Sequence, residues 1–189
     1  MFTIPNILTF LRIILIPFFV GSFYLPFEWS NQLCAFLFAL AAITDWLDGY
    51  LARKWQQTSP LGAFLDPVAD KLMVAAALIV LVQAQPTLFM VIPAVVIIGR
   101  EITISALREW MAELGERATV AVSVIGKFKT AAQMLALVLL IYRDDIGLFP
   151  TFTVGYVLLY VAVILTLWSM LVYLQAAWPA LSRNSNDLP

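Results

Sequence analysis

The sequence predicts an all-α integral membrane protein, with six transmembrane helices in one bundle. Of its 189 residues, 62% are hydrophobic and only 12% are charged, whereas a soluble domain carries about a quarter charged residues. A spanning helix needs about 20 mainly apolar residues, and five long stretches without charge supply them. These stretches are 13–27, 29–44, 72–99, 130–142 and 146–182. We expect a single helical domain over 1–182 and a flexible tail over 183–189.

Helix-breaking and polar residues divide the chain into its spans. Pro26, Glu28 and Asn31 separate the first two spans, and the polar loop RKWQQTSP precedes the third. In that loop Ser59 is expected to cap the third helix, and Pro60 suits its first turn. QAQP, ELGER and RDDIGLFP form the later connections. The expected spans are about 6–25, 31–53, 61–82, 87–110, 120–142 and 151–176.

The distribution of charge orients this bundle. With six spans, both ends of the chain share one side of the membrane, and most Lys and Arg residues fall at or near that side, with Arg143 clearly opposite. The positive-inside rule places that side toward the cytoplasm, and a bacterial inner membrane is the expected location. The first apolar run has no basic residue before it and no small-residue cleavage site. We therefore expect a retained first span, not a removed signal peptide.

The composition also excludes several classes of function. The chain has no histidine and a single cysteine, Cys34. This excludes His-based acid–base catalysis, serine triads, zinc hydrolase motifs and an internal disulfide. The net charge of -1 neither favours nor excludes a nucleic-acid partner, but there is no basic tail, and we expect no such partner.

Four aspartates stand out within the apolar sequence. Asp45 and Asp48 are three residues apart on the second span, and Asp66 and Asp70 are four apart on the third. Each pair therefore shares one helix face. Because a short loop joins the two spans, we expect the helices to pack as neighbours with both carboxylate faces able to meet. Small residues near these aspartates leave room for a ligand to approach the backbone: Gly49, Ala52 and Gly62.

The energetic cost of these aspartates indicates a cation site. One aspartate near the centre of a span costs roughly 2.5 to 3.5 kcal/mol, so four cost on the order of 10 kcal/mol, comparable to the stability of a domain. Carboxylate oxygens suit Mg²⁺, Mn²⁺ or Ca²⁺, and two-metal sites recur in phosphoryl transfer. The alternatives are helix caps or interfacial residues, a cation or proton pathway, and partial pairing with Arg53 and Lys71.

A second group of charges is basic and lies in the fourth and fifth spans and the loop between them. Arg100 and Arg108 are eight residues apart and share a helix face. Arg100 lies well inside an apolar span, where a charge is a functional candidate. Such a group can bind a substrate phosphate; the alternatives are positive-inside topology with lipid headgroup contact, and simple pairing of Arg100 with Glu101. The candidates are Arg100, Arg108, Arg117, Lys127 and Lys129.

One pattern runs through both aspartate pairs and resembles the complete signature of the CDP-alcohol phosphotransferase family: Asp45-x2-Asp48-Gly49-x2-Ala52-Arg53-x8-Gly62-x3-Asp66-x3-Asp70. The segments PNILTFLR, GREITISALREW and GKFKTAAQ resemble those of the bacterial branch that uses glycerol 3-phosphate. The resemblance extends along the chain in length and in number of spans.

The resemblance implies a role for each motif residue. Asp45, Asp48 and Asp66 would bind divalent metal, and Asp70 would complete a second metal site and act as the general base. The cytidine nucleotide would lie against the other motif residues and their neighbours, which are Gly49, Ala52, Arg53, Thr58, Ser59, Gly62 and Thr9. The basic candidates would bind the phosphate of the acceptor.

The implied reaction is Mg²⁺- or Mn²⁺-dependent transfer of the phosphatidyl group from CDP-diacylglycerol to glycerol 3-phosphate. Two divalent ions would assist direct displacement, and the products would be phosphatidylglycerophosphate and CMP, in phospholipid biosynthesis. The resemblance also implies a homodimer in contact with membrane lipids. The alternatives are another acceptor such as inositol phosphate or serine, a cation transporter, and a non-catalytic membrane subunit.

Overall fold

The computed structural model describes residues 4–55, 59–113 and 124–181. The predicted tail over 183–189, together with Thr58 and Arg117, lies outside these residues. Within the described chain there are six helices, as predicted, and they are α1 (Ile4–Phe23), α2 (Ser30–Trp55), α3 (Pro60–Ala84), α4 (Leu88–Glu113), α5 (Val124–Tyr142) and α6 (Thr151–Leu181).

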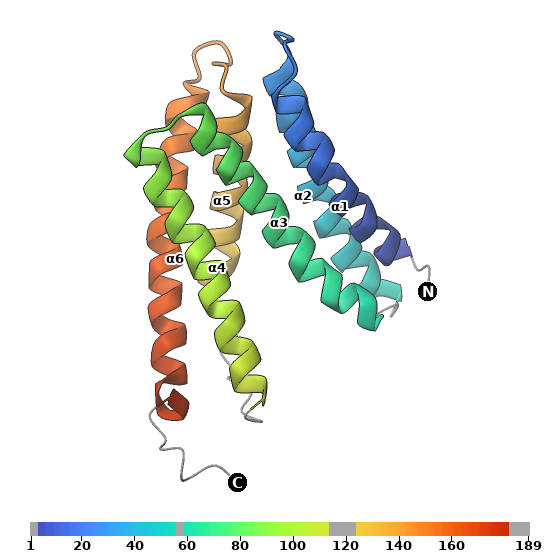
Figure 1. Ribbon diagram of the computed structural model, residues 1–189, viewed down its shortest axis with the longest axis vertical. Helices are drawn as coiled ribbons and strands as arrows, with labels where there is room; N and C mark the ends of the chain where they lie inside the picture. The colour runs from blue at the N-terminus through green and yellow to red at the C-terminus, as the bar shows by residue number, and fades with distance from the viewer. Residues whose placement is uncertain (1–3, 56–58, 114–123, 182–189) are drawn as a thin grey trace.

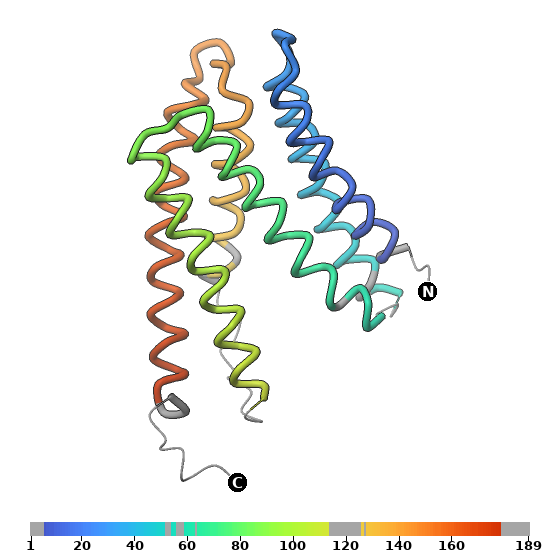
Figure 2. The backbone as a smooth tube through the Cα atoms, in the orientation of Figure 1, coloured from blue at the N-terminus to red at the C-terminus, as the bar shows by residue number. Residues whose placement is uncertain are grey.

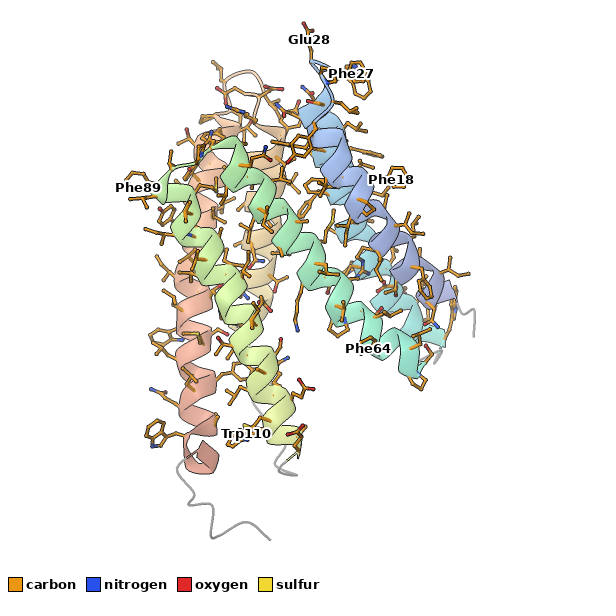
Figure 3. All side chains as sticks on the ribbon, viewed as in Figure 1. Phe18, Phe27, Glu28, Phe64, Phe89 and Trp110 are labelled. Atoms are coloured by element: carbon orange, nitrogen blue, oxygen red, sulfur yellow. The ribbon has the colours of Figure 1, made fainter. Side chains whose placement is uncertain are left out.

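Four of these helices are long and apolar enough to cross a membrane, judged by length and composition: Asn6–Phe23, Ser30–Leu51, Leu88–Glu113 and Thr151–Trp178. α3 is also long, at 25 residues, but its first half contains charged side chains. α5 has a shorter apolar stretch, Phe128–Tyr142. Large apolar side chains such as Phe18 and Phe89 are 64% and 70% exposed and project from the outside of the helices (Figure 3). This surface suits contact with lipid. Together with the long apolar helices, it indicates a multi-pass membrane protein.

The helices form two groups joined by α3 (Figure 1). α1 and α2 pack against each other on one side, and α4, α5 and α6 lie on the other, with α3 crossing between them. The backbone trace in Figure 2 places the turns α1–α2, α3–α4 and α5–α6 at one end of the molecule. The start of α1 and the end of α6 therefore lie at the opposite end, the arrangement expected for six spans.

Close packing joins α5 and α6. Gly155 of α6 lies so near α5 that an added Cβ would be 3.1 Å from the Leu140 backbone nitrogen, and a side chain here would force its neighbours to shift by a few tenths of an ångström. The turn between these helices contains Gly147 with φ 61° and Arg143 with φ 67°. Glycine adopts this left-handed conformation without steric cost. The close approach at Gly155 and the tight turn hold α5 beside α6. This packing positions the polar side chains described below.

Candidate active site

Three buried polar side chains on α1 face the aspartate helices. Asn6, Thr9 and Arg12 are 4%, 1% and 1% exposed, in a helix that is otherwise mainly apolar. Their spacing of three residues places them along one side of α1. Each of them contacts α3 or the residue that precedes it.

The first contact is at the beginning of α3. Ser59 is the N-cap, as predicted: its Oγ accepts a hydrogen bond from the Gly62 backbone N–H at 3.0 Å and donates one to Asn6 Oδ1 at 2.9 Å. A Cβ added to Gly62 would lie 2.6 Å from that same Asn6 oxygen. The absence of a side chain at Gly62 therefore permits the close approach of α1.

The next contacts continue along both helices in the same direction. Thr9 donates to Asp66 Oδ1 at 2.5 Å, and Arg12 Nη1 donates to Asp70 Oδ1 at 2.5 Å. Successive polar residues along α1 therefore lie beside successive positions along α3. Asn6 lies beside Gly62, Thr9 beside Asp66 and Arg12 beside Asp70. α1 and α3 are thus parallel neighbours, matched side chain by side chain.

Arg12 also joins α3 to α2. Its Nη1 lies 2.9 Å from Asp45 Oδ1, and its Nη2 donates to Asp48 Oδ2. The side chain of Asp48 is only 4% exposed, whereas those of Asp45 and Asp70 are 42% and 48% exposed. One guanidinium therefore holds three of the predicted carboxylates together. We call this group the acidic region: Asp45, Asp48, Asp66, Asp70, Arg12 and Thr9.

Arg12 was not among the predicted site residues. The sequence did contain a signal for it, because Asn6, Thr9 and Arg12 are polar residues at three-residue intervals in an apolar span, and a charge inside a span marks a functional candidate. Gly49 follows Asp48 on α2 and is partly buried. Ala52 and Arg53 are also on α2, but their side chains, like that of Lys127 on α5, lie outside the described atoms.

Two of the basic candidates, Arg100 on α4 and Lys129 on α5, meet at Glu101. Glu101 Oε1 accepts from Arg100 Nη1 at 2.9 Å and from Lys129 Nζ at 2.8 Å, which links α4 to α5. Arg100 Nη2 also donates to Ser169 Oγ of α6 at 2.8 Å. The sequence left open whether Arg100 pairs with Glu101; it does, and Lys129 shares that carboxylate.

Arg108 lies two turns further along α4. Its Nη2 donates to the Tyr173 hydroxyl at 2.5 Å, and its guanidinium carbon is 5.0 Å from the centroid of that ring. Arg100 and Arg108 thus both contact α6, which agrees with the prediction that they share a face. We call this second group the basic region: Arg100, Glu101, Arg108, Lys129, Ser169 and Tyr173.

Lys71 links α3 to α4. Lys71, directly after Asp70, donates to Ser105 Oγ of α4 at 2.5 Å. Ser105 in turn donates to the Glu101 backbone carbonyl at 2.6 Å. Lys71 therefore points toward α4, while Asp70 points toward Arg12 on α1. Neighbouring residues of α3 belong to opposite sides of the candidate site.

The carboxylates of the acidic region suit a divalent cation by their donor type. Over the described residues, no three His, Cys, Asp or Glu side chains converge on one cation position, and the guanidinium of Arg12 lies among the carboxylates. Asp45 and Asp70 nevertheless each direct one oxygen to the same nitrogen, and both remain about half exposed. Oxygen donors that already converge on a cationic group and can be reached from outside fit a hard divalent ion.

One family of known proteins matches most of the chain. The family model of the CDP-alcohol phosphatidyltransferases matches residues 2–168, and the chain belongs to that family. Members of the family generally depend on a divalent metal ion.

Similar curated proteins are called CDP-diacylglycerol–glycerol-3-phosphate 3-phosphatidyltransferase. The protein of that name from Haemophilus influenzae is 57% identical over 183 residues, which covers 97% of each chain. The one from Sodalis glossinidius is 58% identical over 92% of this chain and 94% of its own. The one from Yersinia enterocolitica is 55% identical over 93% of this chain and 94% of its own.

Proposed function

We propose that the protein transfers the phosphatidyl group of CDP-diacylglycerol to glycerol 3-phosphate, releasing CMP and forming phosphatidylglycerophosphate. The name shared by the similar proteins supports this choice of substrates. The observation that carries the proposal is the position of α3. It directs Asp70 toward the carboxylates of α2 and Lys71 toward the α4 side, where basic side chains gather.

The acidic region serves the CDP-diacylglycerol half of the reaction. Asp45, Asp48, Asp66 and Asp70 would hold two divalent ions, Mg²⁺ or Mn²⁺. Such ions neutralise charge on the diphosphate and on the departing CMP. The four carboxylates of this region outnumber the single positive charge of Arg12. The region therefore retains the net negative charge that binding of cations requires. Gly49, Ala52, Arg53, Thr58, Ser59, Gly62 and Thr9 are the proposed contacts of the nucleotide.

Asp70 is the proposed general base. Its side chain is 48% exposed, so a substrate hydroxyl can reach it, and it directly precedes Lys71, which points toward the α4 side. A hydroxyl oxygen of glycerol 3-phosphate forms a bond to the phosphorus that bears diacylglycerol, and its proton passes to Asp70. The bond from that phosphorus to the CMP oxygen breaks, and CMP leaves with the electron pair.

The basic region serves the acceptor half. Arg100, Arg108 and Lys129, with Lys127 and Arg117, are the proposed contacts of the acceptor phosphate. Glu101 balances part of this charge, and the remaining positive charge suits a phosphate. Arg100 Nε is buried without a hydrogen-bond partner within the described chain, and so is Gln133 Oε1, whose residue follows Lys129 by four positions on α5 and shares its helix face. Because unpaired buried polar groups are costly, they support a polar ligand nearby.

The proposed location is a bacterial inner membrane, with the active site facing the cytoplasm. The excess of Lys and Arg near the end that contains the start of α1 and the end of α6 supports this orientation. A homodimer in contact with membrane lipids belongs to the same proposal. Chemical crosslinking in native membranes tests the assembly, and labelling of cysteines introduced at Glu28 and Glu113 tests the orientation.

The reaction is tested by CMP release from the purified protein in detergent. CDP-diacylglycerol and Mg²⁺ are supplied with glycerol 3-phosphate, inositol phosphate or serine as the acceptor. We expect release that requires glycerol 3-phosphate and stops when EDTA is added. Release with a different acceptor would overturn the assignment of the acceptor while retaining the chemistry. The absence of release with all three acceptors would reject the proposed reaction.

A further inference from the structure

We propose that Arg12 is a built-in counter-ion of the acidic region, which a divalent cation displaces from Asp45 and Asp70. Arg12 would thus set the affinity of the site for metal and hold the site together when no metal is bound. This inference rests on the proposed function, because it takes the four aspartates to be the metal ligands. It assigns a positioning role to a residue of α1, outside the signature of α2 and α3.

The two terminal nitrogens of Arg12 have different partners. Nη2 donates to Asp48, whose side chain is 4% exposed. Nη1 lies 2.9 Å from Asp45 and 2.5 Å from Asp70, whose side chains are 42% and 48% exposed. An arriving cation therefore meets the carboxylates bound to Nη1 first. The buried bond to Asp48 can keep Arg12 in place while Nη1 gives up its two partners.

The burial of Arg12 explains why the position needs a cation. Its side chain is 1% exposed, and its Nε has no hydrogen-bond partner among the described residues. A charge buried so completely is stable only when it is paired, and Arg12 obtains that pairing from three carboxylates. The carboxylates in turn have a counter-charge before metal binds, so mutual repulsion does not separate α2 from α3.

The same contacts make Arg12 a competitor of the metal. Carboxylate oxygens that bind Nη1 must exchange that bond for a metal bond, and a positive charge so close repels a second cation. Removing the charge of Arg12 should therefore raise the affinity for metal and lower the stability of the metal-free protein. If Arg12 merely packed α1 against α3, its substitution would destabilise both the metal-free and the metal-bound protein.

The experiment measures Mn²⁺ binding by electron paramagnetic resonance on the full chain in detergent, without either substrate. Arg12→Met removes the charge, Arg12→Lys keeps it but loses the fork of two donors, and Arg143→Gln is a control at the other end of the molecule. We expect Arg12→Met to bind Mn²⁺ about tenfold more tightly than wild type, a difference of about 1.4 kcal/mol. Arg12→Lys should lie between them, and the control should equal wild type.

Thermal unfolding of the same proteins supplies a second readout. In EDTA the unfolding midpoint of Arg12→Met should fall below that of wild type, and Mn²⁺ should raise it by more than it raises the wild-type midpoint. Recovery of folded Arg12→Met only in the presence of Mn²⁺ would give the same support. Equal or weaker Mn²⁺ binding by both variants overturns the role of Arg12. Failure of the wild type itself to bind Mn²⁺ would instead reject the proposed metal ligands, and with them this inference.

Discussion

The acidic and basic regions solve the same physical problem with opposite charges. In the acidic region one cation, Arg12, lies among three carboxylates. In the basic region one carboxylate, Glu101, lies between two cations. Each region thus contains a single counter-ion and retains an excess of its own sign, which a ligand of opposite charge can neutralise.

The two counter-ions differ in how they reach their partners. Arg12 comes from α1 and joins α2 to α3, and its partners Asp45 and Asp70 are partly exposed. Glu101 lies on α4 beside one partner, Arg100, and reaches the other, Lys129, on α5; both partners are largely buried, at 11% and 7% exposed. The acidic region is therefore open to exchange with a cation from outside. The basic region is more firmly held, and Arg108 is its exposed member.

The largest expected effect is the loss of turnover when Asp70, the proposed general base, is replaced. Asp70→Asn removes the proposed base while keeping the size of the side chain. We expect turnover to fall by about 1,000-fold, because a positioned general base contributes about 100- to 10,000-fold. CMP release measures this loss. Asp145→Asn, at an exposed position in the α5–α6 turn, is the matched control; full activity of Asp70→Asn would remove Asp70 from the mechanism.

The second prediction removes the counter-ion of the basic region. Glu101→Gln leaves Arg100 and Lys129 without a negative partner, and breaking a buried ion pair costs about 3 kcal/mol. The free energy of unfolding, measured by denaturant titration in detergent, should fall by about that amount. Glu113→Gln, at the exposed end of α4, should leave stability unchanged. If both variants are equally stable, Glu101 is not the stabilising partner that its contacts indicate.

The third prediction separates the two substrates. Arg108→Gln should raise the KM for glycerol 3-phosphate about 30-fold, since a hydrogen bond to a charged group contributes about 2 kcal/mol. The KM for CDP-diacylglycerol should stay within about twofold of wild type. Steady-state CMP release at varied concentrations of each substrate gives both constants. An equal increase in both KM values would indicate that Arg108 has a structural role through Tyr173.

The smallest expected effect concerns the packing of α1 on α3, on which the acidic region depends. Gly62→Ala places a Cβ 2.6 Å from Asn6 Oδ1, and the resulting overpacking should destabilise the protein by about 1 kcal/mol. Gly99→Ala is the comparison, because its added Cβ meets no atom within 4 Å. Thermal unfolding should show a lower midpoint for Gly62→Ala alone. Identical midpoints would mean that Asn6 moves away at no cost.

Much of the site could be predicted because it depends on local spacing. Residues three or four apart on a helix share a face, so the pairs Asp45–Asp48 and Asp66–Asp70 followed directly from the sequence. Local backbone chemistry likewise predicted Ser59 as the cap of α3, and the structure confirms it. The functional roles of the aspartates and of Ser59 stay predictions. So do the contacts expected for four other residues, which are Arg53, Thr58, Lys127 and Arg117.

The sequence by itself determined the all-helical membrane class, the order of the six helices and the faces on which the aspartates lie. These follow from hydrophobic length and helical periodicity, which are properties of each segment alone. Only the tertiary structure decided that Arg12 lies among three aspartates, that Lys129 shares Glu101 with Arg100, and that Lys71 turns toward Ser105. Partners on different helices depend on how the helices pack, and packing is fixed by side-chain contacts across the whole bundle.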